Sequence, residues 1–302
     1  MKEKKASSTA FTVMQGLLHV ASSKDHGYLI QKDVADAGRR ILAASEEGLE
    51  RLQQIERPWS KLSIRLREQL LLPGITVHYA FRKRYVEDQV RKALKDNVSQ
   101  VVILGAGFDP LAWRLSKEGS DVQFIEVDHP ETQKLKSTAF TTPPSEASEN
   151  LHLLSVDFTH QSLQEALEGC SEFSQGCPTI YVCEGVLMYL TKADIDAVFS
   201  AISNLSGKDA LLLFTAVEPQ NSPKNNVKPL LFTYLNLIGE PIKWTVSQEA
   251  LDEFVSAQGC KLIDQAGTEE LIALYVNHSS NYIYHKGEHF GLCKFSCAQE
   301  LR

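Results

Sequence analysis

The sequence predicts an α/β protein with a mostly parallel sheet, preceded by a block of helices. Two observations support this class. From Gln100 onward, short β-branched runs alternate with amphipathic stretches, the rhythm of strands joined by crossover helices. A glycine turn follows the first run, and acidic residues follow the next ones. The 302 residues, 43% hydrophobic and 23% charged, are sufficient for a sizeable core.

The first hundred residues predict helices. Apolar residues between Val34 and Leu52 recur at helical spacing among charged ones, and Pro58 ends that segment. Two further helices are expected over 60–71 and 76–95, separated by the breaker pair Pro73-Gly74. We therefore expect a single domain over residues 1–302, in which residues 1–96 form a helical extension or cap and 97–302 form the α/β core.

Seven runs in that core predict strands. Most are unbroken apolar stretches, which suit strands that are covered on both faces. The expected strands are 101–104, 122–127, 151–156, 179–183, 210–216, 261–265 and 271–276, and the expected helices are 111–117, 130–138, 162–167, 192–205 and 247–257.

Two segments depart from this rhythm. Residues 217–246 are polar and then aromatic, and a long connection of that kind is often an active-site cover, so we expect a substrate lid there. The segment after Val276 is expected to be a polar tail. Its histidines and cysteines fit no familiar zinc spacing, so no metal site is predicted from His278, His285, His289, Cys293 and Cys297.

Charge and composition limit the partners. A net charge of −7 opposes a protein that binds by neutralising phosphates, so nucleic acid is not expected. No run approaches the roughly 18 apolar residues of a membrane span, and the amino terminus does not resemble a secretory signal. Six thinly spread cysteines then indicate reduced thiols in a cytoplasmic protein. The oligomeric state stays open.

The stretch VVILGAGFDPLAWRL predicts a ligand-binding turn. Gly105 and Gly107, on either side of Ala106, lie between an apolar strand and a helix, where backbone without Cβ can approach a ligand closely. A dinucleotide fingerprint would have Gly or Ala where Pro110 stands. A single G-x-G is a weak signal, and a turn that needs glycine only for its backbone angles is the alternative.

Acidic residues end the following strands. Glu126 and Asp128 come about 20 residues after the glycines, on one strand face, where an acid can accept hydrogen bonds from ribose hydroxyls. Either could instead cap the helix that begins at Pro130. Asp157 follows the third strand and Glu184 the fourth. Ligands of open α/β sheets bind at the carboxyl ends of the strands, so the four acids together predict a nucleotide site.

The segments VVILGAGFDPLAWRL, FIEVDHPETQKLK, SVDF and YVCEGVLMYL resemble the successive motifs of the leucine carboxyl methyltransferase family, over about residues 76 to 216. The resemblance implies a class I methyltransferase, Rossmann-like fold. Its seven-stranded, mostly parallel sheet has the order 3-2-1-4-5-7-6, with an antiparallel seventh strand. It also implies S-adenosylmethionine as the cofactor. The amino-terminal 70 residues and everything beyond 217 match poorly, so the resemblance does not identify the acceptor.

The resemblance also assigns cofactor residues. The glycines match those beneath the methionine part, Asp128 the ribose acid, Asp157 the acid beside adenine, and Glu184 an acid near the methionine end. Arg82, in HYAFRKRYVEDQV, matches an arginine for the cofactor carboxylate, a task that suits a planar guanidinium. The expected set is Arg82, Gly105, Ala106, Gly107, Asp109, Glu126, Asp128, Asp157, Phe158 and Glu184.

Two basic positions leave alternatives. Arg82 could belong to a solvated basic face, because Lys83, Arg84 and Arg91 are close in sequence. The family's second basic contact, a lysine nearer the amino terminus, could be Lys24 or Lys32.

The expected activity is methyl transfer to a carboxylate or hydroxyl oxygen of a small molecule. A carboxylate acceptor is already ionised and needs no general base, whereas a hydroxyl does. Candidate bases are His19, His26 and His78, none of which is assigned as catalytic; Tyr189 is a plausible pocket wall. The alternatives are a protein C-terminal carboxyl methyltransferase, a nicotinamide-dependent oxidoreductase and a non-catalytic nucleotide-binding module.

Overall fold

The computed structural model describes residues 6–57, 59–119, 121–141, 148–206, 210–238, 240–277 and 282–295. Within these ranges, seven strands form one sheet in the order β3-β2-β1-β4-β5-β7-β6. The first five strands are parallel, and β7 runs antiparallel to both β5 and β6, as the predicted fold class requires. The strands are β1 (Gln100–Leu104), β2 (Gln123–Asp128), β3 (Leu151–Ser155), β4 (Thr179–Cys183), β5 (Leu211–Val217), β6 (Cys260–Ala266) and β7 (Glu288–Phe295).

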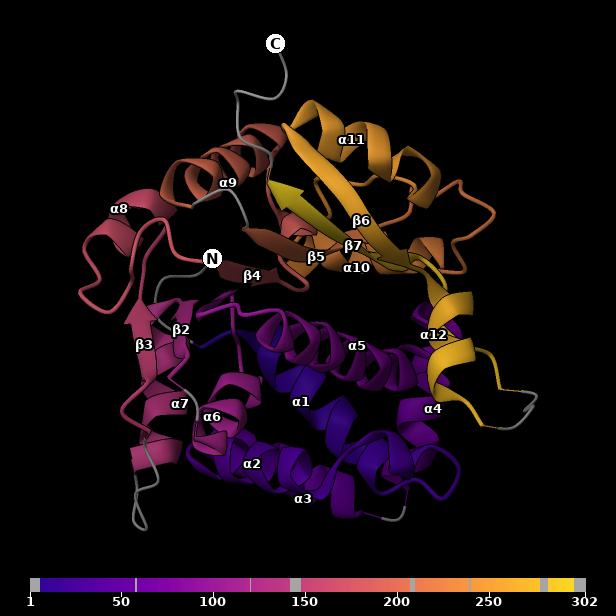
Figure 1. Ribbon diagram of the computed structural model, residues 1–302. Coiled ribbons are helices and arrows are strands. Elements are labelled where there is room, and N and C mark those ends of the chain that lie inside the picture. Colours follow the sequence, from indigo (N-terminus) through magenta and orange to yellow (C-terminus); the bar gives the residue numbers. More distant parts are fainter. Residues whose placement is uncertain are drawn as a thin grey trace.

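Helices cover both faces of the sheet (Figure 1). Val101 and Ile103 pack into the cluster formed with one helical layer, and Val102 and Leu104 into the cluster formed with the other, because alternate residues of a strand point to opposite faces. The first layer contains α5 (Ile75–Lys95), α6 (Leu111–Leu115), α7 (Pro130–Thr141) and α12 (Thr268–Tyr275); the second contains α8 (Leu163–Glu168), α9 (Lys192–Leu205) and α11 (Leu251–Ala257).

Of the helices that precede α5, the first packs on α5, and the second and third pack on the first (Figure 1). The ring of Phe11 lies 4.8 Å from that of Phe108, edge to face. The periodic segment that begins at Val34 is two helices rather than one, because the Ser45 hydroxyl caps a new helix at Gly48 N, 3.1 Å away. These helices are α1 (Ser8–Ala21), α2 (Lys32–Ala43), α3 (Glu46–Glu56) and α4 (Ser60–Leu71).

The seventh strand is not the segment that the sequence pattern suggested. Residues 271–275 belong to α12, which ends just before Val276, and the strand is β7, inside the expected polar tail. A six-residue apolar run does not distinguish a strand from a buried helix, and here the Glu270 carboxylate accepts the Gly267 N–H at 2.9 Å, a helix-start signal. His289 and Cys293 are therefore buried strand residues. His278 and Cys297 lie outside the described residues.

The long connection after β5 contains α10 (Pro229–Ile238) and is attached at both ends. Lys228 N donates to the Leu71 carbonyl of α4 at 3.1 Å, and Lys243 N donates to the Met188 carbonyl at 2.8 Å. Met188 lies in the short 3-10 turn η3 (Leu187–Tyr189) that follows β4; the other such turns are η1 (Gly27–Leu29), η2 (Ser116–Glu118) and η4 (Gln248–Ala250). The connection thus lies beside the carboxyl end of β4.

None of the helices in these described ranges combines the length and apolar character that a membrane span requires.

Candidate functional site

The glycine turn at the end of β1 depends on its two glycines. Gly105 and Gly107 have φ values of 67° and 51°, in the left-handed region that favours glycine. A Cβ on Gly105 would lie 2.5 Å from Cγ2 of Val186, which follows β4. The Val186 side chain therefore occupies the space that a side chain at position 105 would need.

Asp128, the last residue of β2, holds this turn. Its Oδ2 accepts the Gly107 N–H at 2.6 Å, and its Oδ1 accepts the His129 N–H at 2.6 Å. Burial raises the pKa of Asp128, although both N–H groups favour the anion. Each carboxylate oxygen retains a lone pair, so the group can also accept from a ligand hydroxyl.

Glu126, which the sequence-based set places with Asp128, lies away from the sheet edge. It lies two residues deeper in β2 with no exposed surface, and its carboxylate is 2.6 Å from Nζ of Lys136, which is equally buried. Burial raises the pKa of Glu126 to about 7, and Lys136 opposes that shift. We therefore assign Glu126 to the attachment of α7 to β2.

An ion network joins α5, the glycine turn and the end of β4. Lys83 Nζ lies 2.8 Å from Oδ2 of Asp109 and 2.9 Å from Oε2 of Glu184. Arg82 places Nε at 2.8 Å and Nη2 at 2.7 Å from the other oxygen of Glu184. Burial alone would raise the pKa of Asp109, but the Lys83 ammonium lowers it below its usual value. A cavity of about 20 Å³ lies here, beneath Gly105 and Ala106.

Lys83 is a site residue that the sequence interpretation missed. Of the two lysines considered for a second basic contact, Lys24 is exposed and Lys32 pairs with Asp36 on the surface. Lys83 precedes the buried residues Val86 and Val90 by three and seven positions. That spacing places it on the buried stripe of α5, which is the signal that could have identified it.

Arg82 has a second carboxylate partner, which lies far from it in the sequence. Its Nη1 lies 3.2 Å from Oε2 of Glu288, which also lies 2.9 Å from Nε2 of His78. Glu288 begins β7 and pairs in register with Val217, the last residue of β5. Because β7 is antiparallel, its first residue lies at the edge where the parallel strands end.

Histidines enclose this carboxylate. The rings of His78 and His285 are 4.8 Å apart, edge to face, and both are buried. Burial, with His78 alongside, lowers the pKa of His285 to about 3. Burial acts to raise the pKa of Glu288, but Arg82 and His78 hold it well below its usual range. The carboxylate is therefore ionised and His285 neutral at physiological pH.

Two tyrosines and the covering segments border the same region. The Arg82 guanidinium lies 5.5 Å from the ring centre of Tyr79. Burial raises the pKa of Tyr79, and it raises that of Tyr189, in η3, to about 12. Both phenols therefore stay protonated and can donate hydrogen bonds. The Thr9 hydroxyl of α1 donates to Oε2 of Glu240 at 2.8 Å, joining the amino-terminal helices to the long connection.

The other end of the site is open. Val156 N donates to the Asp128 carbonyl at 2.9 Å, so the segment after β3 lies beside Asp128. Asp157 follows, and its Oδ1 accepts from the N–H and hydroxyl of Thr159 at 2.9 and 2.6 Å. Phe158 is 54% exposed, a large apolar surface two residues after Val156.

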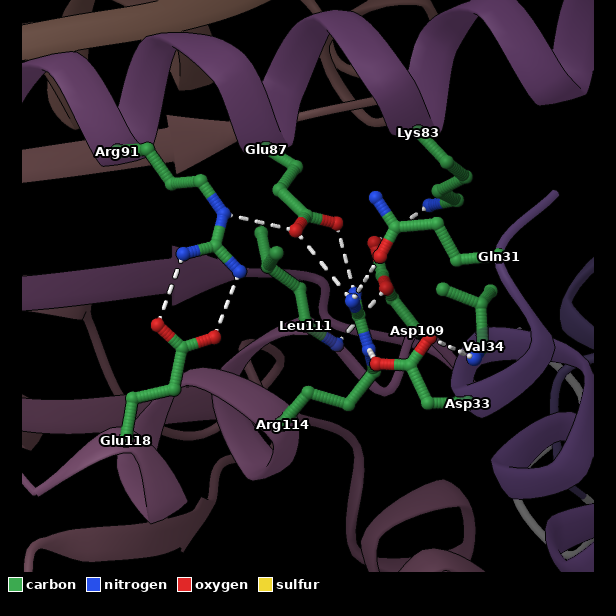
Figure 2. Close-up of polar contacts among 10 residues, drawn as sticks. All are labelled: Gln31, Asp33, Val34, Lys83, Glu87, Arg91, Asp109, Leu111, Arg114 and Glu118. Carbon is green, nitrogen blue, oxygen red and sulfur yellow. Dashed lines mark hydrogen bonds and ion pairs between the residues drawn. The ribbon is translucent and has the colours of Figure 1, made fainter. Parts of the chain in front are cut away.

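A second ion cluster, around Arg114 of α6, lies near Asp109 (Figure 2). Arg114 lies 2.7 Å from Glu87 of α5 and 2.6 Å from Asp33 of α2, and Arg91 bridges Glu87 and Glu118. The cluster ties the amino-terminal helices to the helix that follows the glycine turn.

The remaining histidine candidates lie elsewhere. His26 packs on the rings of Tyr282 and Tyr284, and His19 lies in the last turn of α1. Within the described ranges, no three His, Cys, Asp or Glu residues are grouped so that they could hold a metal ion.

Comparisons with known proteins identify the family of the chain. Residues 17–203 match the model of the family described as leucine carboxyl methyltransferase. A Bacillus subtilis protein named "Putative S-adenosyl-L-methionine-dependent methyltransferase YktD" is 24% identical over 205 residues, 65% of either chain. The Caenorhabditis elegans protein named "Leucine carboxyl methyltransferase 1" is 28% identical over 207 residues, 60% of this chain and 62% of that one.

The chain spans less than two thirds of the length of these curated relatives. Among solved structures, one described as a "putative methyltransferase" from Thermobifida fusca superposes with a TM-score of 0.57 at 14% identity. It covers 86% of this chain and 94% of its own, which shows a shared fold. The family match extends over well more than half of the chain and includes the glycine turn, Asp128 and Glu184. The chain therefore belongs to the leucine carboxyl methyltransferase family.

Proposed function

We propose that the protein is an S-adenosylmethionine-dependent O-methyltransferase that acts on a small carboxylic acid. The observation that carries the proposal is the convergence of Asp128, the glycine turn and the Arg82–Lys83–Glu184 network at one sheet edge. Membership of the family and the names of the curated relatives support the same cofactor.

The residues present fit this cofactor. Asp128 has free lone pairs for the ribose hydroxyls, and the side chains after β3, Asp157 and Phe158, would border the adenine. Three of the five N–H groups of Arg82 are engaged by Glu184 and Glu288, so two remain for a carboxylate. Glu184 and Asp109 supply anions for the ammonium. The cofactor supplies the electrophilic methyl group on its sulfonium.

The side chains around Arg82 favour a carboxylate acceptor. Tyr79 and Tyr189 are donors at neutral pH because burial raises their pKa values, so neither serves as a base. A carboxylate needs only to be aligned and shielded from water, and alignment can contribute on the order of 7 to 11 kcal/mol to lowering the barrier. The chain's residues would thus orient the acceptor rather than deprotonate it.

The cover over this region favours a small acceptor. Thr9 and Glu240 join α1 to the long connection, and Lys243 fixes that connection to η3. Residues 217–246 then act as the lid. A peptide carboxyl terminus, the acceptor of the alternative function, would need this cover to open.

A hydroxyl acceptor is the second candidate, and one contact favours it. His78 places Nε2 at 2.9 Å from Glu288, while its buried Nδ1 has no hydrogen-bond partner among the residues that the structure describes. An imidazole oriented by a carboxylate, with its other nitrogen free, is the arrangement of a general base.

Calorimetry and a radiolabel assay test the proposal. We expect S-adenosylmethionine and S-adenosylhomocysteine to bind, and labelled methyl groups to transfer to members of a carboxylic acid panel. Parallel panels of phenols and alcohols and of peptides with free carboxyl termini separate the alternatives. Absence of binding at millimolar cofactor would reject the proposal, and a fluorescence change with reduced nicotinamide cofactor would favour an oxidoreductase. Cofactor binding without transfer to any panel would indicate a non-catalytic module.

A further inference from the structure

Glu288 gives the methionine end of the site one more negative charge than positive. Arg82 and Lys83 supply two cations, whereas Asp109, Glu184 and Glu288 supply three anions. The count covers Lys, Arg, Asp and Glu side chains; the His78 ring also contacts Glu288, with Nε2 at 2.9 Å from its Oε2. All five charged side chains are buried or nearly so, and charges removed from solvent are screened only weakly by salt.

The surplus can be traced to Glu288. Asp109 pairs with Lys83, and Glu184 lies between Lys83 and Arg82, so these four residues balance. Glu288 reaches Arg82 from β7, on the nitrogen that Glu184 does not contact. Among the described Lys and Arg side chains, the one that pairs with Glu288 is Arg82, which Glu184 also contacts.

The two ligands of the proposed reaction differ by one charge at this end. S-adenosylmethionine carries a sulfonium, an ammonium and a carboxylate, for a net charge of +1. In the transfer, the carbon–sulfur bond to the methyl group breaks as the new carbon–oxygen bond forms, and the sulfonium keeps the electron pair as a neutral sulfide. S-adenosylhomocysteine therefore has a net charge of zero.

We infer that Glu288 is a specificity-determining residue that makes the site prefer the cationic methyl donor over its neutral product. The inference rests on the proposed function. The carboxylate acts through the net charge of the network, and it positions Arg82 for the cofactor carboxylate at the same time. Such a preference would favour exchange of product for a new donor after each turnover.

The test compares three ligands on two proteins. Calorimetry would measure the Kd of S-adenosylmethionine, of S-adenosylhomocysteine, and of an analogue in which a protonated amine replaces the sulfonium. We expect Glu288→Gln to weaken both cationic ligands by about tenfold, equivalent to about 1.4 kcal/mol, and the neutral product by less than about twofold. Glu288→Asp keeps the charge and should keep the preference.

Two further variants complete the design. Glu253→Gln removes an exposed acid from α11, across the sheet, and should leave all three affinities unchanged. Lys83→Gln enlarges the negative surplus and should increase the ratio of donor to product affinity, a readout that does not require Glu288→Gln to fold. Circular dichroism melting curves would show which variants are folded.

The outcomes separate the hypotheses. If Glu288→Gln weakened the binding of all three ligands equally, the inference would be overturned, and Glu288 would have a structural role only. In Lys83→Gln, an unchanged or lower ratio of donor affinity to product affinity would overturn the inference as well. If the wild-type protein bound none of the ligands, the proposed function itself would fail, which is a different result from binding without discrimination.

Discussion

The carboxylate of Asp128 accepts the backbone N–H of Gly107 at 2.6 Å, so the acid at the end of β2 also fixes the glycine turn at the end of β1. Asp128 thus holds the glycine turn in place and also offers a ligand a hydrogen-bond acceptor. Its replacement should affect both the loop and the proposed cofactor.

For Asp128→Ala, we expect cofactor binding to weaken by about 1 to 3 kcal/mol, because a buried N–H and the ribose hydroxyls lose their acceptor. Calorimetry with S-adenosylhomocysteine measures this. Asp128→Asn keeps an acceptor oxygen and should lose less. Unchanged affinity in a folded Asp128→Ala protein would reduce Asp128 to a capping residue.

For Arg82→Lys, we expect the Kd of S-adenosylmethionine to rise by about tenfold or more. An ammonium cannot replace the planar fork that contacts Glu184, Glu288 and a ligand carboxylate together. Arg84→Lys is the matched control, since Arg84 lies on the same helix but over the ring of Tyr275. Equal effects in the two variants would contradict the assigned role.

Gly105→Ala should destabilise the protein by about 1 to 3 kcal/mol, because alanine is strained at a φ of 67° and its Cβ would crowd Val186. Urea unfolding measures the loss. Val186→Ala in the same chain should restore part of it by relieving the contact. If the double variant were no more stable than Gly105→Ala, the strain would come from the backbone alone.

The Glu126–Lys136 pair offers a test of a structural role. Glu126→Gln leaves the buried Lys136 ammonium without a charged partner, so we expect about 3 to 5 kcal/mol of destabilisation. Replacing both, as Glu126→Leu with Lys136→Met, should cost much less. Cofactor affinity in the folded double variant should match the wild type. A selective loss of affinity there would return Glu126 to the cofactor site.

His285 predicts a pH dependence of stability. Its pKa is about 3 in the folded protein and 6.5 in the unfolded chain, so below pH 6.5 the unfolded state binds a proton that the folded state does not. The stability present above pH 6.5 is therefore lost as the pH falls toward 3, by up to about 2 kcal/mol at pH 5.

Urea unfolding of the wild type and of His285→Gln between pH 5 and 8 isolates this contribution. The difference between their free energies of unfolding should shrink toward low pH, because only the wild type loses the contribution of His285. His160→Gln, at an exposed histidine, is the control and should follow the wild type. Parallel curves for His285→Gln and the wild type would show that His285 does not titrate as described.

The chain's local patterns determined most of the fold. Unbroken apolar runs predicted strands covered on both faces, and the glycines and acids that follow them predicted residues at one edge. In a parallel sheet the carboxyl ends of the strands meet, so Gly107, Asp128 and Glu184 come together without further information. The strand order itself came from the resemblance of these motifs to a known family.

Tertiary structure decided what those patterns could not. The six apolar residues 271–276 suit a strand or a helix equally, and only the pairing of β7 between β5 and β6 selected the true seventh strand. Glu126 and Asp128 have the same local pattern, yet the Lys136 ammonium neutralises only the deeper one.

The same holds for the charges around Arg82. Lys83 lies next to it in sequence, but Glu288 is 206 positions away, and their contact exists because an antiparallel strand begins where β5 ends. Sequence patterns specify which residues share a helix stripe or a strand end. The partners of a buried charge depend on which distant segments pack against it, and that is a property of the whole fold.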